Sequence, residues 1–248
     1  MIKLPYKADN VLFLDIETVP ETGTLTRDKN AYKTWIDYFK VAFAGSDQDP
    51  VRLYDQRAAI YPEFGRIVCI SAGFFHHGGF RVKGVSDDDE RVILKWLFSI
   101  ISDKKVIHKH FCGHNIIDFD IPYIVRRAIA LGVEVPDELN FHGKKPWELS
   151  DVLIDTMVIW SCGSRYLGSK SLESVCHALR LPSPKRDMNG KLVRDAWYGG
   201  ERKYKKIINY CNGDVVTAAK VLLRVQGIDV DFEVESHVQC AQLDSKKL

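Results

Sequence analysis

Residues 11–20 have the sequence VLFLDIETVP, and this stretch decides the fold. Its first four residues are apolar, the apolar run ends at Asp15, and Pro20 marks a turn. Short apolar runs that are bounded by turn residues are typical of buried strands. We therefore predict a buried strand from Val11 to Asp15.

Two carboxylates, Asp15 and Glu17, stand two positions apart at the end of this strand. Side chains alternate between the two faces of a strand, so both carboxylates should point to the same face. Carboxylate oxygens are the ligands that Mg²⁺ and Mn²⁺ prefer. An isolated D-x-E pair is also common at solvated strand ends, so the pair needs partners before it indicates a metal site.

Further strands are expected at 66–75, 80–85 and 106–112, because these stretches are apolar and rich in β-branched residues. Helical spacing of apolar residues predicts helices at 92–101, 122–131, 156–160, 171–179 and 203–225. Strands come first and helices alternate with strands later, which indicates one α/β domain with a mixed sheet.

The chain of 248 residues is interpreted as a single domain with a core of about 8–226. Residues 21–65 form a long insertion with several aromatic residues, and we expect it to contain a helix that packs over one side of the site. Residues 230–248 are polar and poorly patterned, so they are predicted to be a tail.

More carboxylates accompany the later helices. Asp120 precedes Pro122 at the start of a predicted helix, where helix capping is the simpler interpretation. Tyr210 and Asp214 are spaced i, i+4 and share one face of the last helix. Carboxylates gathered without cations would repel each other by roughly 4 kcal/mol per pair at about 4 Å and an effective dielectric near 20. If the fold brings them together, metal ions are expected between them.

Basic residues concentrate between Arg180 and Lys206, where nine basic and three acidic residues give a local charge of +6. Trp197, Tyr198 and Tyr204 lie among them, so this segment is a candidate surface for a nucleic-acid strand. A solvated loop and helix start is the simpler interpretation.

Other features exclude several classes of protein. No apolar run approaches the roughly 20 residues that cross a bilayer, and Met1 to Asn10 lacks the pattern of a secretory signal. The six cysteines are scattered without a CxxC pair, which favours free thiols and a cytoplasmic location. His108, His110, Cys112 and His114 alternate along one strand, but ligands in a line fit a tetrahedral zinc site poorly.

Three ordered segments resemble the motifs of the DEDD superfamily of 3′–5′ exonucleases: LDIETVP, HNIIDFDIP and YCNGD. The tyrosine four residues before the last aspartate is similar to the DEDDy subclass. DIETVP, GHNIIDFDIPYI and the stretch from DMNGKLV to IINYCNGDVV resemble, more closely, predicted exonucleases related to the proofreading domain of B-family DNA polymerases. The resemblance implies a ribonuclease H-like mixed five-stranded sheet of order 3-2-1-4-5, flanked by helices.

The resemblance also implies a site. Asp15 would bridge two Mg²⁺ or Mn²⁺ ions, Glu17 and Asp214 would complete one ion, and Asp120 would hold the other. Tyr210 would orient the attacking water, and the product would be a nucleoside 5′-monophosphate released from the 3′ end of single-stranded DNA.

Residues near the second motif are candidates for substrate contacts. His114 and Asn115 would contact the terminal nucleotide and Phe119 would pack beneath the site, although ordinary core packing suits Phe119 better. Lys185 and Arg186 would guide the strand. Asp155 is interpreted as a helix cap. The alternative is that its side chain supports the residues of the site.

Two alternative functions stay open. One is a 3′–5′ exonuclease of RNA, because no motif reports on contacts to the 2′-hydroxyl. The other is a nucleic-acid-binding module without catalysis, which the presence of all four carboxylates and Tyr210 disfavours. A chain of this length leaves no room for a polymerase domain, so proofreading within the same chain is not expected.

Overall fold

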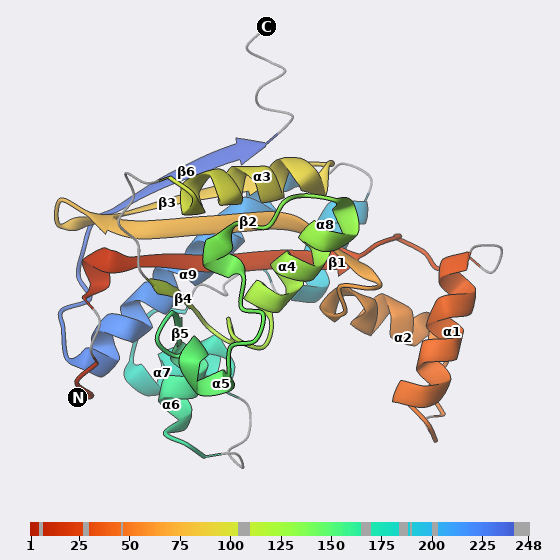
Figure 1. The fold of residues 1–248 in the computed structure, drawn as a ribbon, viewed down its shortest axis with the longest axis horizontal. Helices are drawn as coiled ribbons and strands as arrows, with labels where there is room; N and C mark the ends of the chain where they lie inside the picture. The colour runs from red at the N-terminus through yellow and green to blue at the C-terminus, as the bar shows by residue number, and fades with distance from the viewer. Residues whose placement is uncertain are drawn as a thin grey trace, which may run out of the picture.

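A computed structural model describes residues 1–4, 7–26, 30–45, 47–103, 110–164, 170–183, 188, 190–199 and 203–240 of the chain. Figure 1 shows a long sheet that crosses the body, with helices on both of its faces and two helices at one end. None of the described helices is both long enough and apolar enough to span a bilayer.

The described strands form one mixed sheet in the order β5-β4-β1-β2-β3-β6. The strands are β1 (Val11–Pro20), β2 (Gly65–His76), β3 (Gly79–Ser86), β4 (His110–Gly113), β5 (Leu153–Asp155) and β6 (Val234–Cys240). β1 pairs antiparallel with β2 and parallel with β4, and β2 and β3 form an antiparallel hairpin. The predicted mixed sheet and the order 3-2-1-4-5 are therefore confirmed.

The sixth strand was not expected. β6 lies within residues 230–248, which were predicted to be a tail, and it pairs parallel with β3 from Val234 to Cys240. Most of its residues are exposed or half-buried, so few of them need to be apolar. The alternation of apolar and polar residues that identifies a strand is therefore weak here. The prediction of a patternless tail is wrong for these seven residues.

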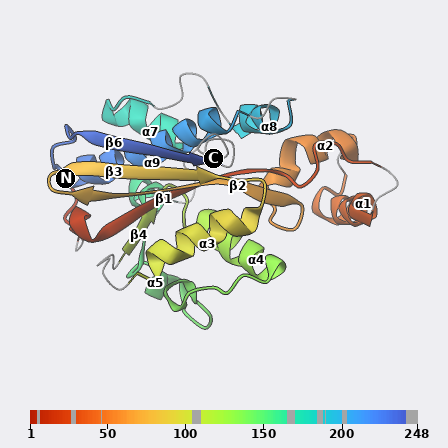
Figure 2. The same cartoon turned by 90° about the horizontal axis from the view of Figure 1, so that it is seen from above.

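The helices lie in two layers around the sheet. Figure 2 shows α7, α8 and α9 on one face and α3, α4 and α5 on the other. The helices are α1 (Asn30–Ala42), α2 (Pro50–Arg57), α3 (Glu90–Ile101), α4 (Asp120–Leu131), α5 (Pro146–Leu149), α6 (Thr156–Ser161), α7 (Leu172–Leu179), α8 (Gly190–Tyr198) and α9 (Tyr204–Gln226). Short 3₁₀ turns are η1 (Ala8–Asn10), η2 (Ala58–Ile60) and η3 (Asp137–Leu139).

Alternation along β1 decides which way its side chains point. Leu12 and Leu14 are in the hydrophobic cluster with residues of α3 and α4. Val11 and Phe13 are in the cluster with residues of α9. Since the period of a strand is two residues, Asp15 and Glu17 continue the face that is turned to α9.

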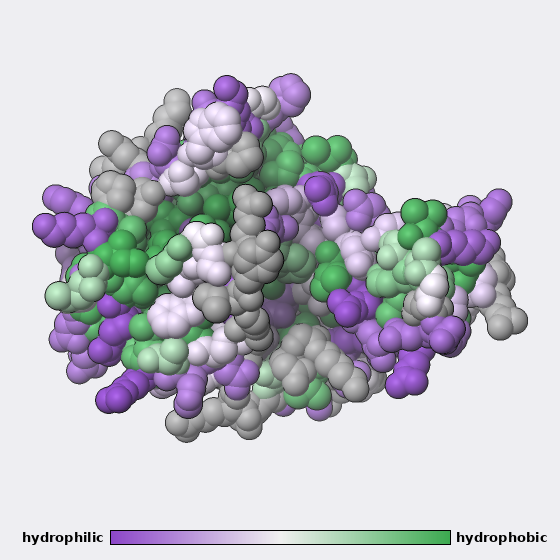
Figure 3. Space-filling view, turned by 90° about the horizontal axis from the view of Figure 1, so that it is seen from below, coloured by the Kyte–Doolittle hydropathy of each residue, from purple (hydrophilic) through white to green (hydrophobic). Residues whose placement is uncertain are grey.

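The insertion 21–65 carries two helices, α1 and α2, followed by η2, where one helix was predicted. It has its own aromatic cluster around Trp35, which is fully buried and packs edge-on against Tyr54 and Phe64. In the view from below, this lobe projects from one side of the body, and hydrophilic and hydrophobic side chains are mixed on it (Figure 3).

A buried ion pair connects α3, α4 and the end of the insertion. The Arg127 guanidinium donates to both oxygens of Glu90, with a shortest distance of 2.7 Å, and to the Pro62 carbonyl at 3.0 Å. Glu90 also accepts from the amide of Ile67 at 2.8 Å. This network holds the two helices of one layer against β2.

Candidate active site

The site begins where β4 leaves β1. β4 pairs with β1 only from Val11 to Phe13, so the later residues of β1 have no strand on that side. The Ile16 amide donates instead to Asp120 Oδ1 at 3.1 Å. The first residue of α4 is thereby held beside the end of β1, which explains why a buried carboxylate stands at this helix start.

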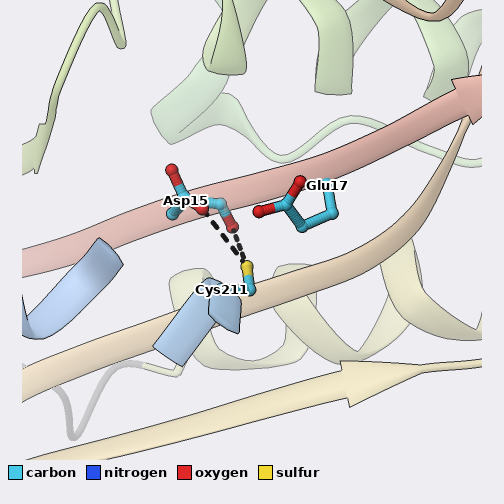
Figure 4. A group of neighbouring side chains, drawn as sticks. All are labelled: Asp15, Glu17 and Cys211. Carbon is cyan, nitrogen blue, oxygen red and sulfur yellow. Dashed lines mark hydrogen bonds between the residues drawn. The ribbon is translucent and has the colours of Figure 1, made fainter. Parts of the chain in front are cut away.

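Asp15 and Glu17 lie side by side on one face of β1, as predicted, and this face is turned to α9 (Figure 4). Cys211 of α9 is the third member of this group, and one ligand atom from each of the three lies within 4.8 Å of the others. The Cys211 thiol donates to the Asp15 carbonyl at 3.3 Å and to Asp15 Oδ2 at 3.4 Å. These contacts fix the position of the Asp15 carboxylate.

Hydrogen bonds of Asn212 attach helix α9 to the sheet. The Asn212 amide nitrogen donates to Ser236 Oγ and the His237 carbonyl of β6, both at 3.0 Å. Asn212 Oδ1 accepts from Ser71 Oγ at 2.7 Å. These bonds set the rotation of the helix, so that Cys211 and Asp214 are turned toward β1.

The four predicted carboxylates interact electrostatically. Burial raises the pKa of Asp15 well above its usual value, and the neighbouring Asp214, Glu17 and Asp120 raise it further. Burial also raises the pKa of Asp120 to about 7, against the lowering effect of the bond from Ile16. Negative charges from β1, α4 and α9 therefore act on Asp15, while the ligand atoms that lie within 4.8 Å of one another in the described part of the chain come from Asp15, Glu17 and Cys211.

The raised pKa of Asp120 predicts a pH-dependent stability for the protein without metal. The unfolded carboxyl ionises near pH 3.9, whereas the folded one keeps its proton up to about pH 7. Between these values the folded state binds more protons, so the free energy of unfolding should fall as pH rises, by up to about 1.4 kcal/mol per pH unit. Urea unfolding in EDTA at several pH values measures this slope.

The Asp120→Asn variant should show a smaller slope, because it removes the titrating group. Asp118→Asn is the matched control, because Asp118 lies two residues earlier and is exposed. Equal slopes in the wild type and in Asp120→Asn would contradict the electrostatic description of the site.

Tyr210 stands one turn before Asp214 and forms a hydrogen bond with it. Burial and the carboxylates of Asp214, Glu17 and Asp15 raise the pKa of Tyr210 far above its usual value. The phenol therefore stays protonated at neutral pH, and it acts as a hydrogen-bond donor and not as a base.

Asp155 organises the turn that leads to Asp120. Its carboxylate caps α6 by accepting from the Met157 and Val158 amides at 2.8 and 3.3 Å. It also accepts from the amides of Asn115 and Ile117 at 3.0 and 3.2 Å. The predicted cap is present, and the same carboxylate supports the turn between β4 and α4.

The predicted substrate residues in this turn have different surroundings. Both ring nitrogens of His114 are engaged within the protein, with Thr156 Oγ1 at 2.8 Å and the Lys170 carbonyl at 2.6 Å. Asn115 has a left-handed backbone with φ of 69°, which asparagine tolerates well. Phe119 lines a cavity beside Glu17. Of these three residues, Phe119 is the one that lines this cavity together with Glu17.

The basic segment has a different structure from the one that its sequence suggested. Lys185 and Arg186 lie outside the described residues. Trp197 and Tyr204 are buried, with 1% and 3% of their surface exposed, and pack edge-on against each other. The Tyr198 hydroxyl donates to the Pro20 carbonyl at 2.6 Å. The Trp197 and Tyr204 rings hold α8 and α9 together and do not offer faces for stacking on bases, and Tyr198 attaches α8 to the end of β1.

The alternating histidines and cysteine do not gather a metal site in the described part of the chain. His110 contacts the Asp151 carbonyl through Nδ1 at 3.0 Å, and Cys112 is fully buried. His108 lies outside the described residues.

Cys211 is the site residue that sequence reasoning missed. It directly follows Tyr210 on α9, and the motif analysis gave it no role in the site. Its spacing of i, i+3 to Asp214 is the signal that places both side chains toward β1.

Comparison with known proteins shows the family of the chain and supports its fold. A family model described as a predicted 3′–5′ exonuclease related to the exonuclease domain of PolB matches residues 60–248. The chain belongs to this family. The match includes Asp120, Tyr210 and Asp214 and begins after Asp15, Glu17 and most of the insertion. Membership in the PolB-related exonuclease family confirms the resemblance drawn from the three motifs.

A solved structure supports the fold. The family B DNA polymerase from the hyperthermophilic archaeon Pyrobaculum calidifontis aligns with 87% of this chain at a TM-score of 0.52 and 19% identity. The alignment covers 24% of the polymerase chain, so this chain corresponds to about a quarter of that protein. No curated protein matches the chain.

Proposed function

We propose that this protein is a metal-dependent 3′–5′ exonuclease that releases nucleoside 5′-monophosphates from single-stranded DNA. The observation that supports the proposal is the group of Asp15, Glu17 and Cys211 from β1 and α9, with Asp120 held at the Ile16 amide and the charges of Asp120 and Asp214 acting on Asp15. Membership in the PolB-related exonuclease family supports the reaction class and a nucleic-acid substrate.

The donor set suits two Mg²⁺ or Mn²⁺ ions. The four carboxylates offer hard oxygen ligands, and the pKa values of two of them, Asp15 and Asp120, are raised first by burial and then by neighbouring carboxylates. Asp15, with Glu17 and Asp214, would hold one ion, and Asp15 with Asp120 would hold the other. When bound, the ions would supply an activated water and stabilise the departing oxygen.

The protein's own groups prepare this chemistry. The Tyr210 hydroxyl, kept protonated, uses its one proton for the hydrogen bond to Asp214, so its oxygen would accept a hydrogen bond from a water beside the carboxylates and orient it. The Cys211 thiol holds Asp15, and the Ile16 amide holds Asp120. Asp15 and Asp120 are thus each preorganised by a second group, which limits the reorganisation needed during the reaction.

DNA is favoured over RNA because the family is related to the exonuclease domain of a DNA polymerase. Phe119 is proposed to contact the terminal nucleotide, and Lys185 and Arg186 to guide the strand. The roles of His114 and Asn115 are proposed to be indirect, through the shape of the turn that both residues form. The cytoplasmic location expected from the cysteine pattern stays a prediction.

Matched DNA and RNA oligomers, labelled at either end, test the proposal. In Mg²⁺ or Mn²⁺, a 3′-labelled DNA strand should lose its label as a mononucleotide, whereas a 5′-labelled strand should shorten stepwise. EDTA should stop both reactions. Faster degradation of RNA would show that RNA is the preferred substrate. Binding without degradation of either polymer would show that the protein is a nucleic-acid-binding module without catalysis.

A further inference from the structure

An exposed aromatic and basic segment precedes β5. Residues 140–148 have the sequence NFHGKKPWE, in which two aromatic residues and a histidine lie next to two lysines. Trp147 is 66% exposed, and it is the one aromatic residue among the large hydrophobic side chains that are exposed in the described part of the chain. An indole has a large apolar surface that normally stabilises a fold by burial, so its exposure here indicates a contact with a ligand.

Local hydrogen bonds give the segment 140–148 a defined shape. The Lys144 amide donates to the Phe141 carbonyl at 3.1 Å, which closes a turn. The Lys145 amide donates to the Glu148 carboxylate at 2.6 Å, as part of a capping box at the start of α5. This bond engages Glu148, which is the acidic residue of the segment. The side chains of the segment are therefore presented by an ordered backbone.

The two lysines of the segment lie over its aromatic rings. Lys144 Nζ is 5.5 Å from the centre of the Phe141 ring, and Lys145 Nζ is 5.1 Å from that of the Trp147 ring. Such contacts hold an ammonium near an aromatic face without neutralising its charge. No carboxylate in the described part of the chain forms an ion pair with either lysine. Since an ammonium covers only one face of a ring, the other face of Trp147 is available to a ligand.

A groove of about 760 Å³ connects this segment with the active site. Ile121, the residue after Asp120, lines the groove, and so do Phe141 and His142 of the segment. The segment reaches α5, which lies in the same layer as α4 (Figure 2). Arg126 of α4 adds an exposed guanidinium, and no carboxylate is among the described residues that line the groove. An apolar and positively charged surface therefore extends from the helix start that holds Asp120 to the segment 140–148.

These features suit a nucleic-acid strand better than an apolar peptide. Phosphates bind to ammonium and guanidinium groups, and bases stack on exposed aromatic rings. An apolar peptide could fill the groove, but it would leave the two lysines without a counter-charge. The basic segment between Arg180 and Lys206 was expected to offer this combination, but its Trp197 and Tyr204 are buried. The segment 140–148 has both the charge and the exposed ring.

We propose that the segment 140–148 is a second contact region for the substrate and binds the single strand upstream of its 3′ end. Lys144 and Lys145 contact phosphates, one base stacks on Trp147, and the groove guides the strand from there toward Asp120. The inference rests on the proposed function and adds residues that lie outside the carboxylate cluster. Because the strand must reach from the carboxylates to Trp147, only longer substrates gain affinity from this segment.

Removing the indole tests the inference. In EDTA, where the strand is not degraded, Trp147→Ala should weaken binding of a single DNA strand of about 12 nucleotides by about 10-fold, measured by fluorescence anisotropy. With Mg²⁺, kcat/KM on the same strand should fall by about the same factor. On a dinucleotide, which cannot reach the segment, kcat/KM should change less than about two-fold. Trp147→Phe keeps an aromatic face and should recover most of the binding.

The lysines have a separate measurement. Lys144→Gln combined with Lys145→Gln removes two phosphate contacts, so the slope of log affinity against log salt concentration should become shallower by about 1.4. Lys95→Gln is the matched control, because Lys95 is an exposed lysine of α3 that lies outside the segment and does not line the groove. The control should keep the affinity and the salt dependence of the wild type.

Several results would overturn the inference. Wild-type binding by Trp147→Ala, with an unchanged salt dependence in the double lysine variant, would leave this surface to a protein partner. Equal losses on the dinucleotide and on the longer strand would place the effect of Trp147→Ala in the active site and not in strand binding. A wild type that binds no strand would overturn both proposals. A wild type that binds the strand without degrading it would refute the proposed function alone, and the binding measurements would then decide on the segment 140–148.

Discussion

Replacing Asp15 by alanine is expected to lower the rate of nucleotide release about 10⁴-fold while binding of a single strand stays measurable. Asp15 is the carboxylate on which the charges of Asp214, Glu17 and Asp120 act together. Its removal therefore takes away the group through which all the others would share metal ions. Single-turnover release of a 3′-terminal nucleotide measures the rate, and fluorescence anisotropy measures binding.

Asp15→Asn separates charge from packing. The amide keeps the shape of the side chain, so a loss as large as that of the alanine variant would assign the effect to the carboxylate charge. Asp118→Ala is the surface control and should keep wild-type activity, because Asp118 is exposed although it lies within the second motif. An Asp15→Ala protein with wild-type activity would remove the basis of the assigned site.

The central strand and the carboxylates were predictable because they combine strong local patterns. The apolar run VLFL before Asp15 is a short buried strand, and its period of two residues is enough to place Asp15 and Glu17 on one face. The i, i+4 spacing does the same for Tyr210 and Asp214 on α9. That the two faces meet required the motif resemblance, because periodicity contains no information on which elements are neighbours.

Other features depend on partners that lie far away in the sequence. β6 is an edge strand with four exposed residues at its start, so it is defined by its ladder with β3 and not by an apolar pattern. The cavity beside Glu17 is lined by Arg194 and Asp55, which pair with each other although they are 139 residues apart in the sequence. The composition of the basic segment did not predict the role of its aromatic residues, because Trp197 and Tyr204 pack in a buried hydrophobic cluster and not against a ligand.

The second large effect concerns stability. Arg127→Met is expected to destabilise the protein by about 3–5 kcal/mol, because it leaves the buried Glu90 carboxylate without its cation. Only 9% of the Arg127 side chain and 4% of the Glu90 side chain are exposed, so water cannot replace the lost partner. Urea unfolding at neutral pH measures the change. Arg91→Met on α3 is the control, because its ion pair with Asp89 is 3.6 Å long and half exposed, and it should cost less than about 1 kcal/mol.

A double variant shows whether the charge itself causes the loss. Glu90→Gln removes the buried charge but keeps an oxygen that can accept from the Ile67 amide, a bond of 2.8 Å in the wild type. Combined with Arg127→Met, it should recover about half of the lost stability, because replacing a buried pair costs less than breaking it. A double variant that is as unstable as the sum of the single variants would show that the Pro62 carbonyl contact and packing dominate. In that case the attachment of the insertion to α4 would depend on the shape of Arg127 and its contact with the Pro62 carbonyl more than on its charge.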